Sequence, residues 1–175
     1  MADFPVRGTA PPVVICSYLS PEALGVEVVG FAQAYTASGA LTANIVYYVP
    51  FRLAAPYTAA QMFIQNGTSL GANFDLGIYT QDGKQIVTTG VTAQVGTSVL
   101  QIVDMTDTLL LPGRYYMALV TNTTAQVARM AVALVILQSM GELQESSATL
   151  PATATFAKAT ATHLPLIGIT GSTTV

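Results

Sequence analysis

His163 is the only histidine in this chain, and it lies between Thr162 and Leu164 in a stretch rich in threonine and alanine. A histidine held beside a serine and a carboxylate can act as the general base of a hydrolase. No segment of the sequence resembles the sharp turn that presents a nucleophilic serine in such enzymes. We therefore expect no catalytic residue and predict that the protein is not an enzyme, with a hydrolase built on His163 as an alternative.

Two acidic residues, Asp104 and Asp107, are three positions apart in what we expect to be one loop around Met105 to Thr108. Such a pair binds a hard cation only when several further oxygen atoms join it, and we interpret it as capping turns. A single cysteine, Cys16, permits neither an intrachain disulfide nor a paired-cysteine metal site. We interpret Cys16 as a small buried apolar residue and expect no metal and no cofactor.

Other side chains could take part in binding. The triplets that begin at Asn66 and Asn122 match the glycosylation acceptor pattern, but we interpret both as turns because the sequence does not begin with a secretory signal. Aromatic faces can pack on the apolar faces of sugar rings. The tyrosines that could offer such a surface for a glycan are Tyr47, Tyr48, Tyr57, Tyr79, Tyr115 and Tyr116.

Charged residues are scarce in this sequence. They make up 9% of it, against 51% hydrophobic residues, whereas a soluble domain usually carries about a quarter charged residues. A surface this poor in charge is explained most simply if other subunits cover it. We therefore expect a homo-oligomer, a trimer in our interpretation. The net charge of −3 and the scattered basic residues predict that the chain does not bind nucleic acid, and its longest apolar run, 131–137, predicts no membrane span.

The segment from Asn73 to Gly90 gives the clearest structural signal. Phe74, Leu76 and Ile78 alternate with other residues as in a strand with one apolar face. Asp82-Gly83 suits a two-residue type I′ turn, because both central positions there need a positive φ. The sequence therefore predicts a β-hairpin.

Further strands are expected where apolar residues alternate or where turn residues bound a short apolar run. These expected strands are 44–53, 60–65, 98–104, 113–122 and 125–130. Pro50 should place the second half of the first of them at a sheet edge or a bend. Strands separated by turns, without a βαβ rhythm, predict an all-β antiparallel β-sandwich of jelly-roll type, with a partly open barrel as the alternative.

The ends of the chain are predicted to differ from the middle. Residues 1–43 form an expected N-terminal arm and edge segment, with a turn or two of helix starting at Ser20-Pro21. Residues 44–141 form the expected sandwich domain, which ends in a short helix over 132–140 that Gly141 caps. Residues 142–175 are rich in threonine, alanine and proline and are expected to form an extended C-terminal arm.

Three motifs together resemble a group of small virion proteins of tailed bacteriophages: YYVPFRL at 47–53, GIYTQDGKQIVTTG at 77–90 and LLLPGRYYMALV at 109–120. LPATATF at 150–156 and LPLIGI at 164–169 extend the resemblance. It implies a β-sandwich that serves as a tail, fibre or capsid-decoration protein in the virion, made in the host cytoplasm. Its partners would be copies of itself and other virion proteins. The alternative is a module that binds a cell-surface glycan or receptor.

Overall fold

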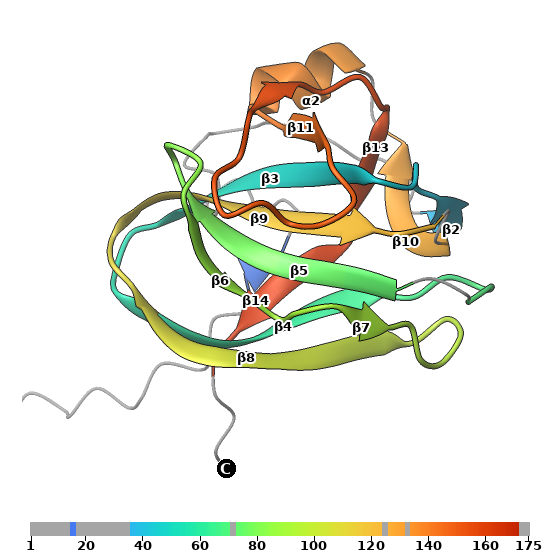
Figure 1. The fold of residues 1–175 in the computed structure, drawn as a ribbon, viewed down its shortest axis with the longest axis horizontal. Coiled ribbons are helices and arrows are strands. Elements are labelled where there is room, and N and C mark those ends of the chain that lie inside the picture. Colours follow the sequence, from blue (N-terminus) through green and yellow to red (C-terminus); the bar gives the residue numbers. More distant parts are fainter. Residues whose placement is uncertain (1–14, 17–35, 71–72, 124–125, 132–133, 172–175) are drawn as a thin grey trace, which may run out of the picture.

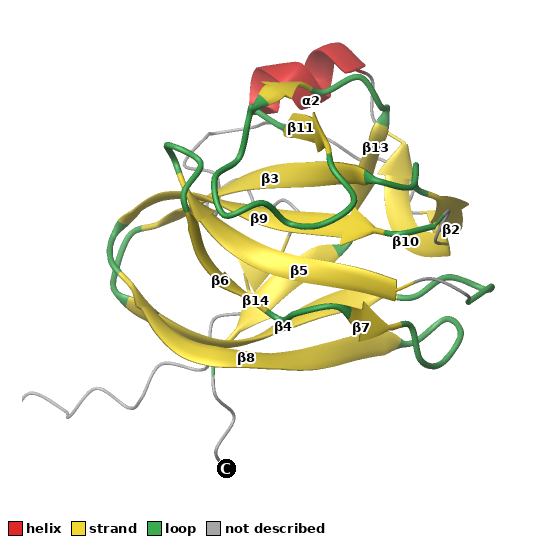
Figure 2. Cartoon of the chain, in the orientation of Figure 1, coloured by secondary structure: helices red, strands yellow, loops and turns green. Residues whose placement is uncertain are grey.

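The computed structural model describes residues 15–16, 36–70, 73–123, 126–131 and 134–171. Within these ranges the chain is mostly β-strand, and the strands form three antiparallel sheets (Figure 1, Figure 2). The prediction of an all-β antiparallel fold is therefore confirmed. The helix start predicted at Ser20-Pro21 and the side chain of Cys16 lie outside the part of the chain that the structure describes.

The largest sheet has seven strands and contains the middle of the chain. In spatial order its strands are β12 (Ala157–Lys158), β11 (Leu143–Ser146), β3 (Ile45–Leu53), β9 (Gly113–Thr121), β5 (Asn73–Thr80) and β6 (Gln85–Thr88), and β7 (Thr92–Ala93) also pairs with β5. We call it the large sheet.

Two smaller sheets complete the fold. The four-stranded sheet has the order β1 (Ile15–Cys16), β14 (Ile167–Thr170), β4 (Tyr57–Gln65) and β8 (Leu100–Leu110). The three-stranded sheet has the order β13 (His163–Pro165), β10 (Gln126–Ala131) and β2 (Thr36–Ala40). Helix α2 (Leu134–Met140) lies within the range for which the sequence predicts a helix, and Gly141 follows it with a φ of 83°.

The inner core lies between the large sheet and the four-stranded sheet. Successive side chains of a strand point to opposite faces of the sheet, so every second side chain points into this core. The sequence predicts this alternation for β3, β5 and β9. The large sheet contributes Tyr47, Val49, Phe51, Phe74, Leu76, Ile78, Met117 and Leu119; the four-stranded sheet contributes Ala59, Met62, Ile64, Leu110, Ile167 and Ile169. These side chains are nearly all inaccessible to solvent, so the two sheets are held together by apolar burial.

A second apolar cluster covers the opposite face of the large sheet. Residues 147–156, which we call the strap, follow β11 and cross in front of β3 and β9 (Figure 1). Leu150 of the strap packs with Tyr48 and Tyr79 of the sheet. Gly77 allows this approach, because a Cβ there would lie 2.8 Å from Cδ1 of Leu150. The middle of strand β3 is thus covered on both faces.

The central hairpin is confirmed, but its turn differs from the prediction. Strands β5 and β6 pair, and the N–H of Gly83 donates to the carbonyl of Thr80 at 3.0 Å. Of the turn residues, Gly83 has a positive φ, of 87°, whereas Asp82 does not. The type I′ turn is therefore wrong, since it needs a positive φ at both positions. A longer loop with Gly83 in the left-handed region fits the register shift beside Tyr79.

The expected loop from Met105 to Thr108 is also wrong, because those residues belong to β8. The register of β8 against β4 shifts between Ala59 and Gln61, which pair with Thr108 and Asp104. Strand β8 is the last of its sheet, so polar residues on it can face solvent. That exposure explains why the stretch has the composition of a loop.

The two terminal segments contribute strands to the sheets of their own chain. Strands β11 and β12 extend the large sheet, and β14 lies between β1 and β4, where Ile167 and Ile169 are fully buried. The strands after residue 142 therefore pair within the fold: β11 and β12 in the large sheet, β14 in the four-stranded sheet and β13 in the three-stranded sheet. In the segment 1–43, β1 and β2 pair with β14 and β10.

Candidate functional site

The side chains that suggested catalysis or metal binding do not come together. His163 lies on β13, opposite Ala131 of β10, and no described hydrogen bond joins it to a serine or a carboxylate. Asp104 accepts a hydrogen bond of 2.6 Å from Nε2 of Gln61, and Asp107 is exposed on the same strand. Among the described residues no three histidine, cysteine or acidic side chains are placed to share a metal ion.

The six candidate tyrosines lie on strands, and three of them are buried. Tyr47, Tyr48 and Tyr79 are at most 1% exposed. The hydroxyl of Tyr79 donates to the carbonyl of Pro151 at 2.7 Å. Burial raises the pKa of both Tyr48 and Tyr79 well above the usual range, so both phenols keep their protons. Tyr48 and Tyr79 pack against the strap and Tyr47 lies in the inner core, so none of these three rings offers a surface to a glycan.

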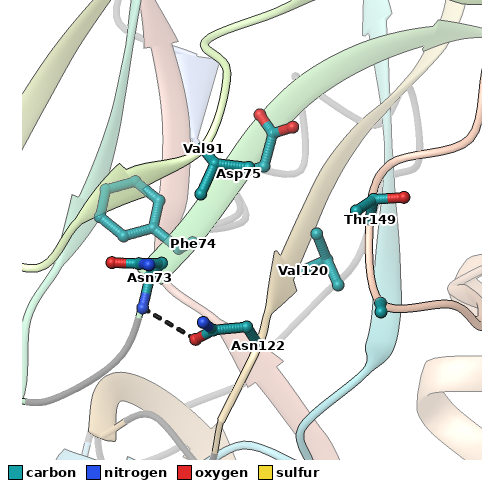
Figure 3. A pocket seen from close by; sticks show the side chains of 8 residues that line it. Asn73, Phe74, Asp75, Val91, Val120, Asn122 and Thr149 are labelled. Atoms are coloured by element: carbon teal, nitrogen blue, oxygen red, sulfur yellow. Dashed lines mark hydrogen bonds between the residues drawn. The ribbon is translucent and has the colours of Figure 1, made fainter.

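The two glycosylation triplets differ in exposure. Asn66 is completely buried, and its Nδ2 donates to oxygens of Val95, Gly96 and Gln101. A glycan cannot be attached to a side chain enclosed in this way without unfolding its surroundings. Asn122 is exposed, and its Oδ1 accepts the N–H of Asn73 at 2.9 Å (Figure 3). The interpretation of Asn66-Gly67 as a simple turn therefore missed a buried polar centre.

A small depression lies where β5 meets the strap (Figure 3). Its volume of about 20 Å³ is enough for about one water molecule. Asp75 lines it and is 7% exposed. Burial raises the pKa of this carboxyl, while hydrogen bonds from Thr88 and Thr89 oppose that rise. The depression is too small for an organic ligand, and the Asp75 carboxyl is occupied by contacts of its own chain.

Exposed apolar side chains gather at one end of the molecule. We call this surface the apolar end; its members are Leu70, Val95, Val99, Leu100 and Ile102, all at least 40% exposed. It comprises the loop after β4 and the loop before β8, together with the start of β8. The N–H of Ser98 donates to the carbonyl of Gly67 at 2.8 Å and so joins the two loops.

The segments that build the apolar end contain no charged residue. None occurs between Arg52 and Asp75, or between Lys84 and Asp104. Large exposed apolar patches are typical of surfaces that contact another protein, and the cores of such interfaces are depleted in charge. This end of the molecule therefore has the composition of an interface core.

The Asn66 side chain fixes the loop that carries Val95 and Val99. Its Oδ1 accepts a hydrogen bond from Gln94, and its Nδ2 donates to the carbonyls of Val95 and Gly96. Gln101 adds two bonds of 2.9 Å, from the N–H of Val95 to its Oε1 and from its Nε2 to the carbonyl of Ala93.

Because these hydrogen bonds hold the loop, the backbone that carries its apolar side chains is ordered. Association then costs less conformational entropy than it would with a loose loop. Sequence reasoning did not identify the apolar end. The two uncharged runs that flank the central hairpin were the available signal, but only the fold shows that their ends meet.

Comparison with models of protein families finds none that matches this chain, and comparisons with curated proteins and with solved structures find no match either. In the part of the chain that the structure describes, no helix has the length and apolar character needed to cross a bilayer.

Proposed function

We propose that this protein is a non-enzymatic structural subunit of a tailed-bacteriophage virion and that it assembles as a symmetric homo-oligomer, a trimer. The observation that carries the assembly role is the apolar end, where five large apolar side chains are exposed on segments that contain no charged residue, the next charge along β8 being Asp104. Left in water, such a surface is unfavourable; a symmetric interface between copies would bury it.

The arrangement of the resembling motifs supports the assignment to a virion. The three motifs supply β3, the β5–β6 hairpin and β9, and β3, β9 and β5 are adjacent strands of the large sheet. Residues far apart in the sequence that resemble one protein group thus form one structural unit here.

We also propose a jelly-roll relationship for the sandwich. Strands β3, β9 and β5 are adjacent in the large sheet. Strand β4 follows β3 in the chain and β8 precedes β9, and β4 and β8 pair with each other in the four-stranded sheet. Two chain segments that run through both sheets as antiparallel partners are typical of a jelly roll.

The assembly role is tested with variants of the apolar end. A double variant, Val95→Thr with Leu100→Thr, keeps side-chain size roughly constant at Val95 and makes both positions more polar. Val135→Thr on α2 is the matched control, because Val135 is 72% exposed and lies outside the apolar end. The double variant should dissociate at higher protein concentrations than the wild type in sedimentation velocity, and the control should not. Equal association of all three proteins would exclude the apolar end as the interface.

A further inference from the structure

Two arginines lie directly opposite each other on adjacent strands of the large sheet. Arg52 of β3 pairs in register with Arg114 of β9, and these are two of only six lysines and arginines in the chain. Residues that pair in this way have Cβ atoms about 4.5–5.5 Å apart, and like charges at such positions destabilise a sheet. The fold therefore brings together two positive charges that repel each other.

Both arginine side chains point away from the inner core. The two chain neighbours of Arg52 are buried in that core, so Arg52 faces the opposite side of the sheet. Arg114 shares this side because directly paired residues share a face, and both arginines are exposed. Tyr116, two positions further along β9, lies on the same side, where its ring packs 4.9 Å from the Phe156 ring. The outer face of the sheet thus carries two arginines next to a tyrosine.

The guanidinium groups have no acceptor within the described part of the chain. Neither Arg52 nor Arg114 makes a hydrogen bond or an ion pair with a described residue. Asp82, in the turn after β5, is exposed and is not joined to them. On β11, Oε2 of Glu145 already accepts two hydrogen bonds from other residues. The arginine N–H groups are therefore left to solvent or to a bound acceptor.

The hydroxyl of Tyr116 is a further donor at this surface. Burial raises the pKa of Tyr116, and the positive charge of Arg114 opposes that rise. The guanidinium is therefore close enough to act on the hydroxyl. A protonated phenol can donate a hydrogen bond to an anion. We call the side chains of Arg52, Arg114 and Tyr116 the donor cluster.

The charge of the donor cluster defines the ligand that suits it. A guanidinium presents its N–H groups in a planar fork that matches two oxygens of a carboxylate or a phosphate. A carboxylate has one negative charge and would leave one arginine without a counter-charge. A phosphate monoester has a charge of about −1.5 to −2 at neutral pH and three acceptor oxygens. It therefore matches both arginines in charge and in number of acceptors.

We propose that the donor cluster is a binding site for a phosphate group. The anion lies over the pairing of β3 with β9, accepts hydrogen bonds from both guanidinium groups and removes their mutual repulsion. Strand β4 begins after the turn that follows Arg52 and ends at the first loop of the apolar end. The two surfaces thus lie at opposite ends of β4, and the inference is independent of the proposed assembly role.

The test is an NMR titration of the wild-type protein that follows the side-chain Nε–Hε signals of its arginines. The probes are inorganic phosphate, glucose 6-phosphate and acetate at one constant ionic strength. The signals of Arg52 and Arg114 should saturate with a common midpoint for phosphate, and acetate should bind at least about tenfold more weakly.

The two phosphate probes distinguish the sources of the ligand. A similar midpoint for both shows that the phosphate group alone is recognised, and a lower midpoint for glucose 6-phosphate assigns the site to an organic phosphate. Shifts that rise linearly without saturation for both probes, or acetate binding as tight as phosphate binding, would overturn the proposal.

Variants locate the bound phosphate. Arg52→Gln and Arg114→Gln should each weaken phosphate binding by about tenfold or more, because each removes one charged hydrogen-bonding partner. Lys158→Gln is the control: Lys158 is exposed on β12, which β11 separates from β3, and this variant should bind phosphate as the wild type does. Unchanged phosphate binding in both arginine variants would refute the site.

Urea unfolding gives a second readout of the same site. Phosphate stabilises folded proteins in general because it is excluded from their surface, and that effect should be equal in all variants. Bound phosphate adds stability only to a protein that keeps its site. Phosphate should therefore raise the unfolding midpoint of the wild type and of Lys158→Gln more than that of Arg114→Gln. An equal rise in all three proteins would contradict the proposal.

Discussion

The hydroxyl of Tyr48 donates a hydrogen bond of 2.9 Å to Oε2 of Glu145, and the same oxygen accepts the N–H of Thr155 at 3.0 Å. Tyr48 comes from the centre of the large sheet and Thr155 from the strap, so one carboxylate joins the two. The ring of Phe156 also packs edge-on against the Tyr48 ring at 5.0 Å. The strap is therefore part of the packed fold.

Tyr48→Phe should lower the free energy of unfolding by about 1–3 kcal/mol, because it removes a hydrogen bond from a buried hydroxyl to a carboxylate. The ring remains, so the packing is retained. Tyr115→Phe is the control, since its hydroxyl donates to the carbonyl of Leu111 in an exposed position, and it should lose less than about 1 kcal/mol. Urea unfolding measures both; equal losses would show that the Glu145 contact does not anchor the strap.

A chain that ends at Thr162 should fail to fold, because it lacks β13 and β14. Strand β14 occupies a central place in the four-stranded sheet, and Ile167 and Ile169 are fully buried. Circular dichroism with a thermal scan should show no cooperative transition. A milder change is Ile169→Ala, which should lower the free energy of unfolding by about 2–5 kcal/mol. The control Leu109→Ala, at a side chain that is 63% exposed, should lower it by about 0.5 kcal/mol or less. Cooperative melting of the shortened chain would show that the C-terminal segment is dispensable.

Asn66→Ala should destabilise the protein by about 1–3 kcal/mol, because it removes the hydrogen bonds of a fully buried side chain to Gln94 and to the carbonyls of Val95 and Gly96. The amides of residues 94–99 should then exchange hydrogen faster. Asn122→Ala removes the matching residue of the other Asn-X-Thr triplet, which is exposed, and should have a smaller effect. Unaltered exchange in Asn66→Ala would mean that this side chain does not fix the loop.

Gly83→Ala and Gly90→Ala separate backbone strain from steric overlap. Both glycines have a positive φ, 87° and 73°, so a Cβ should cost about 1–2 kcal/mol at either site. At Gly83 the Cβ would also lie 3.0 Å from the carbonyl oxygen of Ala154, whereas at Gly90 nothing lies within 4 Å. Gly83→Ala should therefore be the more destabilising in urea unfolding; the reverse order would contradict the contact between the turn and the strap.

The strands at the centre of the fold could be predicted because both of their faces are constrained. In the middle of β3 and β9 the side chains face alternately the inner core and the second apolar cluster, so apolar residues occur at successive positions. Strand β8 lacks this constraint along its outer edge, and its Thr106 and Asp107 are exposed. An edge strand with such residues cannot be told from a loop by composition.

The C-terminal segment was harder to interpret for a different reason. Its threonines, alanines and prolines form short pieces whose partners lie about one hundred residues earlier in the chain, as with Ile169 and Met62. Local pattern contains no information on such pairings. The apolar end could not be predicted for the same reason. Its uncharged runs are visible in the sequence, but the hydrogen bonds of Asn66 that order it depend on the tertiary fold.

The central claim is that copies of this chain associate through an uncharged apolar surface. Sedimentation equilibrium of the purified full-length wild type is the most direct test. We predict a species of three 18.2 kDa chains whose stability changes little with salt, because the contacts are apolar. A single 18.2 kDa chain at every concentration up to the millimolar range would contradict the claim.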